Sequence, residues 1–343
     1  MKPEPTKTHP LINLLIVVAV AIALIAMVKI NYQAERPSGL GQDYQYDVTS
    51  LATIDPNLIT YEIAGPVLAT GLSQAHGLDV DENGLIYVVG QGGLVVLDGQ
   101  GDVTLKQSSD EPLRAIDVTS DGRIFVATAN HVEVYDHEGQ TLASWDPLGD
   151  KALITRILVT DSTVYVADAG RRQVLLYDHS GMLTGSISQD EEAHFEGFIV
   201  PSAYFDLALG RDGLLRVANP GRLRIDTFTQ DGAYEFSWGE ASNGIEGFCG
   251  CCNPAALAVL PDGGFITAEK GLMRVKHYSS DGGFLGVVAG PKELQVSMQP
   301  KVCKTPEDCQ PDALDVAVDN TGRVYVLDTH QARVRIFVPK ENQ

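Results

Sequence analysis

The five cysteines are the residues of this chain best suited to chemistry. Cys249, Cys251 and Cys252 lie together in the run GFCGCCNP, and Cys303 and Cys309 form a second group. Three interpretations stay open. Outside the cytoplasm disulfides are the default, and five thiols then leave one over. Four thiolates would instead suit zinc, copper(I) or an iron–sulfur cluster, although this spacing is not a standard zinc or ferredoxin pattern. Free or redox-active thiols are the third interpretation.

A second candidate set consists of polar residues that stand directly ahead of six similar segments of the chain. Its members are His76, Arg114, Arg156, Tyr204, Asn253 and Asp312. Side chains of both charges and several hydrogen-bonding types would suit a small polar or anionic ligand. The remaining histidines fall mostly in expected turns or strand ends, which argues against a multi-histidine metal site. No Ser/His/Asp elbow, phosphate-binding loop or H-E-x-x-H pattern occurs, so an enzyme is the less favoured class.

The six similar segments determine the expected fold. They begin at Gly77, Ala115, Arg156, Phe205, Leu257 and Leu314. Each has an alternating strand, a turn such as Asn83-Gly84 and a β-branched strand such as residues 86–88, and further alternating strands follow. Repeats of roughly 40 to 60 residues with four strands predict a six-bladed β-propeller. Trp145 and Trp238 occupy equivalent places in two repeats, which predicts a packing role.

The two ends of the repeat region are expected to meet. The last repeat ends near Phe337 after three strands, and an unassigned alternating run precedes the first repeat. We expect that run to supply the missing outer strand, so that residues 58–339 form the propeller and 340–343 a tail. The polar set and both cysteine groups precede inner strands, and such connections gather around the mouth of the central channel. The sequence therefore predicts one functional face.

Two stretches resemble a known repeat family. Residues 164–181 (VYVADAGRRQVLLYDHSG) are similar to an NHL repeat, as is the region from Phe236 through Asn253-Pro254 to Asp262-Gly263. The resemblance covers residues 58–338 and implies an all-β, NHL-like six-bladed propeller. Such propellers include scaffolds, ligand binders, lyases and hydrolases. A binding or scaffold module is our first hypothesis, a cysteine-held metal or redox centre the second, and a lyase or hydrolase using His76 the third.

The N-terminal region and the charge indicate where the propeller is expected to act. Residues 11–28 (LINLLIVVAVAIALIAMV) contain one polar residue, Asn13. We expect a transmembrane signal anchor over 11–30, a cytoplasmic tail over 1–10 and a tether over 31–57. The propeller is then membrane-bound on the extracytoplasmic side, periplasmic or extracellular. A net charge of −20 disfavours nucleic acid and leaves a protein or small ligand as the partner.

Overall fold

The computed structural model describes residues 10–34, 53–250, 252–296 and 313–341. The chain divides into two units, residues 1–47 and 48–343. In the first unit, helix α1 (Pro10–Ala34) begins with a proline and continues in Leu, Ile, Val and Ala, a sequence free of internal helix breakers. Its side chains from 14 to 27 are exposed. Among the side chains that are described, no helix is both long enough and apolar enough to cross a membrane.

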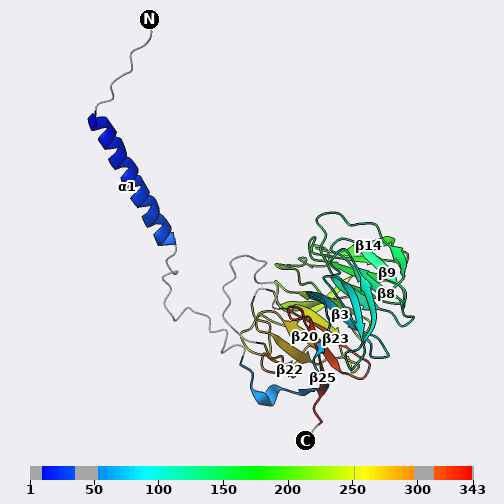
Figure 1. Cartoon of the computed structure of the whole chain (residues 1–343). Helices are drawn as coiled ribbons and strands as arrows, with labels where there is room; N and C mark the ends of the chain where they lie inside the picture. The colour runs from blue at the N-terminus through cyan, green and yellow to red at the C-terminus, as the bar shows by residue number, and fades with distance from the viewer. Residues whose placement is uncertain (1–9, 35–52, 251, 297–312, 342–343) are drawn as a thin grey trace. The chain divides into compact units, whose positions relative to one another are not determined.

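The second unit is a ring of six antiparallel sheets, the six-bladed propeller that the repeats predict (Figure 1). Blades one to three are β3–β6 (Ala75–Val80, Ile86–Gly90, Gly93–Leu97, Val103–Ser108), β7–β10 (Ala115–Val118, Ile124–Ala127, Val132–Tyr135, Thr141–Ser144) and β11–β14 (Ile154–Val159, Val164–Asp168, Gln173–Tyr177, Leu183–Ile187). Blades four to six are β15–β18 (Leu207–Leu209, Leu215–Asn219, Arg224–Phe228, Tyr234–Trp238), β19–β22 (Ala256–Val259, Phe265–Glu269, Arg274–Tyr278, Phe284–Ala289) and β23–β25 (Leu314–Val318, Val324–Asp328, Arg333–Pro339) with two N-terminal strands.

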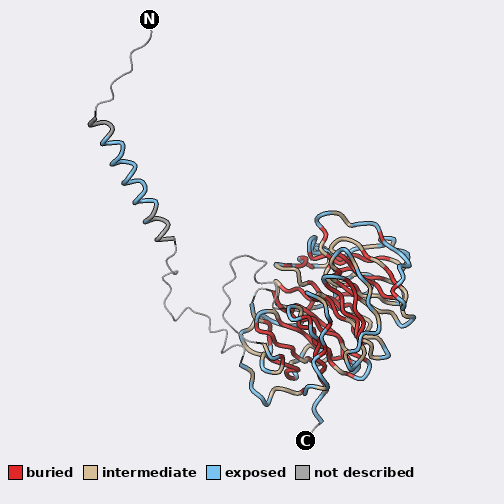
Figure 2. The backbone as a smooth tube through the Cα atoms, in the orientation of Figure 1, coloured by how far each residue is buried: buried red, intermediate tan, exposed pale blue. Residues whose placement is uncertain are grey.

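The burial of each blade follows from its sequence. The second strands, such as β4 and β12, are buried at every residue because both of their faces pack against neighbouring blades. The outer strand β10 is exposed throughout. In the first hairpin, Asp81 Oδ1 accepts the N–H groups of Asn83 and Leu85, and Gly84 takes the positive φ of 80° that the turn requires. The core therefore runs between the blades (Figure 2).

Blade six is built from both ends of the propeller. β1 (Tyr61–Ile63) pairs with β25, with Tyr61 opposite Pro339, and β2 (Leu68–Ala69) continues along the same strand with Leu68 opposite Val334. Tyr61 is buried in the core between blades five and six. The strand expected from the run before the first repeat thus lies on the last blade and closes the ring.

Carboxylates of the inner strands join neighbouring blades. In each of four cases an aspartate Oδ2 accepts a backbone N–H of the next inner strand at 2.7–2.8 Å: Asp79 from Val118, Asp117 from Val159, Asp206 from Leu257 and Asp315 from Leu78. Bonds to a charged acceptor are stronger than those between neutral groups. The last pair joins blade six to blade one, so these carboxylates hold the ring as well as line it.

Both tryptophans pack between blades, which confirms the role that their repetition predicts. The Trp145 ring lies 5.0 Å from that of Tyr177, and the Trp238 ring lies 5.3 Å from that of Phe265. Each indole covers a turn of the following blade so closely that a Cβ at Gly181 would meet Trp145 at 2.7 Å. The indoles thus act as spacers between blades.

Candidate functional site

A cavity of about 310 Å³ opens where the inner strands begin. Four of the predicted mouth residues line it, namely His76, Arg114, Arg156 and Tyr204. They come from the starts of β3, β7 and β11 and from the connection before β15. The ring topology brings them together although they are far apart in the sequence. The volume of the cavity lies at the lower end of the range for small-molecule sites, roughly 300 to 1,000 Å³.

Arg114 is the basic group of this mouth. Its guanidinium is half-buried, and burial lowers its pKa. No carboxylate is paired with it among the residues that the structure describes. Burial and the nearby Arg114 also lower the pKa of His76 to about 4, so its imidazole is neutral at neutral pH. Arg114 therefore presents a positive charge to the cavity beside neutral hydrogen-bonding groups.

The most buried part of the cavity wall holds a cluster of acidic side chains around one cation. Arg156 Nε lies 3.2 Å from Asp206 Oδ1, and Arg156 Nη1 lies 3.9 Å from Asp315 Oδ1. Burial by itself would lower the pKa of Arg156, but these carboxylates, with Asp79 and Asp117, raise it. Burial in turn raises the pKa of all four aspartates. The Arg156 guanidinium is thus the cation that interacts with all four carboxylates, and the cluster carries excess negative charge when the four aspartates are ionised.

The remaining predicted residues of the mouth are placed differently. Asn253 is buried and is not part of the cavity wall. Its Nδ2 donates to Cys249 O at 2.6 Å and to Lys270 O at 3.1 Å, and its Oδ1 accepts from Lys270 N at 2.7 Å. Asp312 lies outside the described residues. Asn253 therefore holds the cysteine connection, residues 239–255, against the turn after β20.

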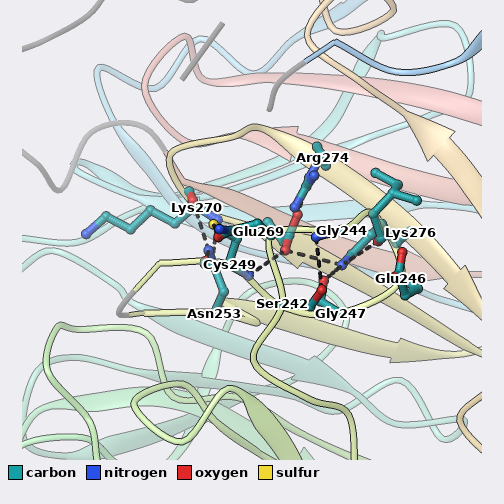
Figure 3. A network of polar contacts seen from close by, with 12 residues as sticks. Ser242, Gly244, Glu246, Gly247, Cys249, Asn253, Glu269, Lys270, Arg274 and Lys276 are labelled. Carbon is teal, nitrogen blue, oxygen red and sulfur yellow. Dashed lines mark hydrogen bonds and ion pairs between the residues drawn. The ribbon is translucent and has the colours of Figure 1, made fainter. Parts of the chain in front are cut away.

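The cysteine connection is anchored by a residue at the end of the second strand. In blades three and four, Asp168 Oδ1 and Asn219 Oδ1 each accept a backbone N–H from the connection before their own blade at 2.9 Å. Blade five has the longer Glu269 at this position, and its Oε1 lies 3.5 Å from Cys249 N. The same repeat position thus contacts the connection in these three blades, and in blade five that connection carries the thiols (Figure 3).

Glu269 belongs to a fully buried ion network. It pairs with Arg274 Nε and, at 3.2 Å, with Lys276 Nζ. Lys276 Nζ also donates to Gly247 O at 2.6 Å and lies 4.6 Å from the centre of the Phe248 ring. Burial lowers the pKa of Lys276 to about 8, against the effect of Glu269. In this network two cations and one anion together hold residues 245–249 in place (Figure 3).

The thiols themselves are only partly described. Cys249 is a half-buried free thiol and Cys252 is buried, while Cys251, Cys303 and Cys309 lie outside the described residues. Within the described part of the chain, no three His, Cys, Asp or Glu side chains come together as a metal site would require. The predicted disulfides and the predicted metal centre thus stay predictions.

Sequence reasoning missed several residues of this face. Asp206 and Asp315 line the cavity, and so does His330 from an exposed turn, the kind of position that the sequence predicts for most of the histidines. The recurrence of aspartate in the inner strands, as in Leu78-Asp79-Val80 and Leu314-Asp315-Val316, was a usable signal for the carboxylates. No pattern in the sequence marks Lys276 as a buried partner of Glu269.

The comparisons with known proteins agree with the architecture. The NHL repeat family model matches residues 312–337, which comprise most of blade six. The sixth blade matches the NHL repeat. Among solved structures, this propeller resembles a streptogramin B lyase with a TM-score of 0.54 at 11% identity, over 82% of this chain and 98% of that one.

A second structural neighbour of this propeller is a protein of unknown function from Bacteroides caccae. It has a TM-score of 0.52 at 14% identity, over 64% of this chain and 82% of the other. At such identities both similarities show the fold alone. No curated protein matches the sequence.

Proposed function

We propose that the NHL propeller is a binding module that takes a small anionic ligand in the cavity at its channel mouth. The observation that carries the proposal is Arg114, a half-buried guanidinium on the cavity wall without a paired carboxylate among the described residues. A guanidinium is a bidentate donor that matches carboxylate and phosphate. Tyr204 and the neutral His76 line the same cavity and add hydrogen-bonding capacity.

Thermal unfolding of the full chain with a panel of small carboxylates and phosphates tests this proposal. A ligand at about 100 times its Kd stabilises the folded state by about 2.7 kcal/mol, which shifts the melting temperature measurably. We expect at least one anion to do so, and we expect Arg114→Gln to abolish the shift. Arg211→Gln, on an exposed turn, is the matched control. An unchanged shift in Arg114→Gln would contradict the proposal. Conversion of the anion, followed by mass spectrometry, would indicate a lyase or hydrolase instead.

A metal-linked role of the cysteine connection is the second candidate. Cys249 and Cys252 stand in C-x-x-C spacing on a segment fixed by Glu269 and Asn253. Two thiols are fewer than the four ligands of structural zinc or an iron–sulfur cluster, so such a centre also needs the cysteines outside the described residues. About one metal equivalent in protein purified without air or chelator, lost in Cys252→Ser, would support this role. Metal-free protein would count against it.

We also propose that α1 tethers the propeller to a membrane, with the propeller on the extracytoplasmic side. A helix of 25 residues is about 37 Å long, and its side chains from 14 to 27 are apolar and exposed. Alkaline extraction should leave the chain in the membrane fraction, and protease added to intact cells or spheroplasts should digest the propeller. Release of the chain by alkali would contradict the tether.

A further inference from the structure

The cavity at the channel mouth carries charge of both signs on its walls. These charges define the class of ligand more closely than the proposed function does, and the inference drawn from them rests on that proposed function. Arg114 supplies positive charge from a half-buried position on the wall. Asp206, just before β15 of blade four, and Asp315, on β23 of blade six, supply carboxylates that are more deeply buried. A ligand that contacts both groups meets a cation and two acids.

The inner carboxylates are not fully neutralised by the protein. Arg156 is the cation paired with both Asp206 and Asp315, and the charges of Asp79 and Asp117 act on the same guanidinium. Burial raises the pKa of Asp315 to about 7, and the Asp206 carboxylate adds to this effect although Arg156 opposes it. A second positive charge beside these aspartates would therefore be stabilised.

The carboxylates also keep hydrogen-bonding capacity for a ligand. The Oδ1 atoms of Asp206 and Asp315 accept from the backbone N–H of the following residue and face Arg156. Their Oδ2 atoms accept one bond each, from Leu257 N and Leu78 N, and a carboxylate oxygen can accept two. Among the described residues these acids do not form a group of three that would hold a metal ion. An ammonium group, which donates up to three hydrogen bonds, suits such acceptors better than a metal.

We propose that the ligand of the channel mouth is a small zwitterion, whose carboxylate binds Arg114 and whose ammonium binds Asp206 and Asp315. A cavity of about 310 Å³ restricts it to a compact molecule of the size of an amino acid or a short amino carboxylate. The distance between the two charges of the ligand then has to match the distance between Arg114 and the two aspartates.

Calorimetric titration of the full chain with matched ligands tests this inference. The probes are the ω-amino acids from glycine to 6-aminohexanoate and the unsubstituted carboxylates of equal length, acetate to hexanoate. We expect one chain length to bind about tenfold or more tightly with its ammonium than without it, because a hydrogen bond to a charged group adds that much. Asp315→Asn and Asp206→Asn should each reduce this preference, and Asp161→Asn on an exposed turn should not.

The outcomes separate the inference from the proposed function. If the plain carboxylates bind, lose affinity in Arg114→Gln and match the amino carboxylates at every length, the zwitterion is excluded and the anion site stands. If the wild type binds neither series, the zwitterion is excluded. The anion site is overturned as well if no phosphate of the thermal-unfolding panel stabilises the wild type. The comparison of ligands on the wild-type chain decides the question even if an aspartate variant fails to fold.

Discussion

Replacing Asp315 by asparagine should make the propeller progressively more stable than the wild type as the pH rises from about 5 to 7. Burial, opposed by Arg156 and assisted by Asp206, raises the pKa of Asp315 from the ordinary 3.8 to about 7. Between these two values the folded chain holds a proton that the unfolded chain has released. The free energy of unfolding therefore falls as the pH rises, whereas asparagine does not titrate and escapes this loss.

The size of the effect follows from the shift of the Asp315 pKa. Each pH unit between the two pKa values costs about 1.4 kcal/mol, so the difference between variant and wild type should grow by about 3 kcal/mol from pH 5 to 7 and then level off. Asparagine can still accept the Leu78 N–H through its amide oxygen. The attraction to Arg156 acts on the ionised carboxylate and is already among the causes of the Asp315 pKa, so it adds no separate pH dependence.

Urea unfolding of the full chain in one neutral detergent, followed by the fluorescence of Trp145 and Trp238, measures this difference at pH 5, 6, 7 and 8. Asp161→Asn, on an exposed turn, is the control and should track the wild type at every pH. The electrostatic account of the channel would be refuted if the difference in the free energy of unfolding between Asp315→Asn and the wild type stays constant with pH. It would also be refuted if the advantage of the variant shrinks as the pH rises.

Two further variants test how the rest of the propeller holds its site. Lys276→Met should lower the free energy of unfolding by about 3 kcal/mol and speed alkylation of the half-buried Cys249, because a fully buried ion network loses one partner; Lys106→Met, on an exposed strand, should do neither. Tyr61→Ala should lower the free energy of unfolding in urea by about 3 to 5 kcal/mol, because it leaves a cavity in the closing blade. Ile63 is 44% exposed on the same strand, and Ile63→Ala should lower it by less than about 1 kcal/mol.

The blades could be predicted because their determinants are local. Alternating strands, turns such as Asn83-Gly84 and buried β-branched strands recur six times, and each is readable within one repeat. The closing strand was readable as well, because blade six has only three strands after Leu314 and an alternating run precedes blade one. The position of a residue in the repeat then placed His76 and Arg114 at the mouth.

The chemistry of the channel could not be predicted in the same way, because it depends on which repeats face each other across the ring. Arg156 comes from blade three, and its partners Asp206 and Asp315 come from blades four and six. Lys276 in the sequence RVKHY looks like a solvent-facing residue of an alternating strand. Its burial depends on Glu269 and on loop carbonyls that only the folded blade brings to it.

A crystal structure of the protein soaked with 4-bromobenzoate would test the central claim, that the channel mouth binds an anion through Arg114, most directly. The bromine locates the probe by its anomalous signal, and the aryl bromide does not alkylate thiols. We predict the carboxylate within hydrogen-bonding distance of the Arg114 guanidinium, in the cavity that His76 and Tyr204 also line. Bromine found only elsewhere on the protein, with Arg114 paired to an acidic side chain of its own chain, would contradict the account.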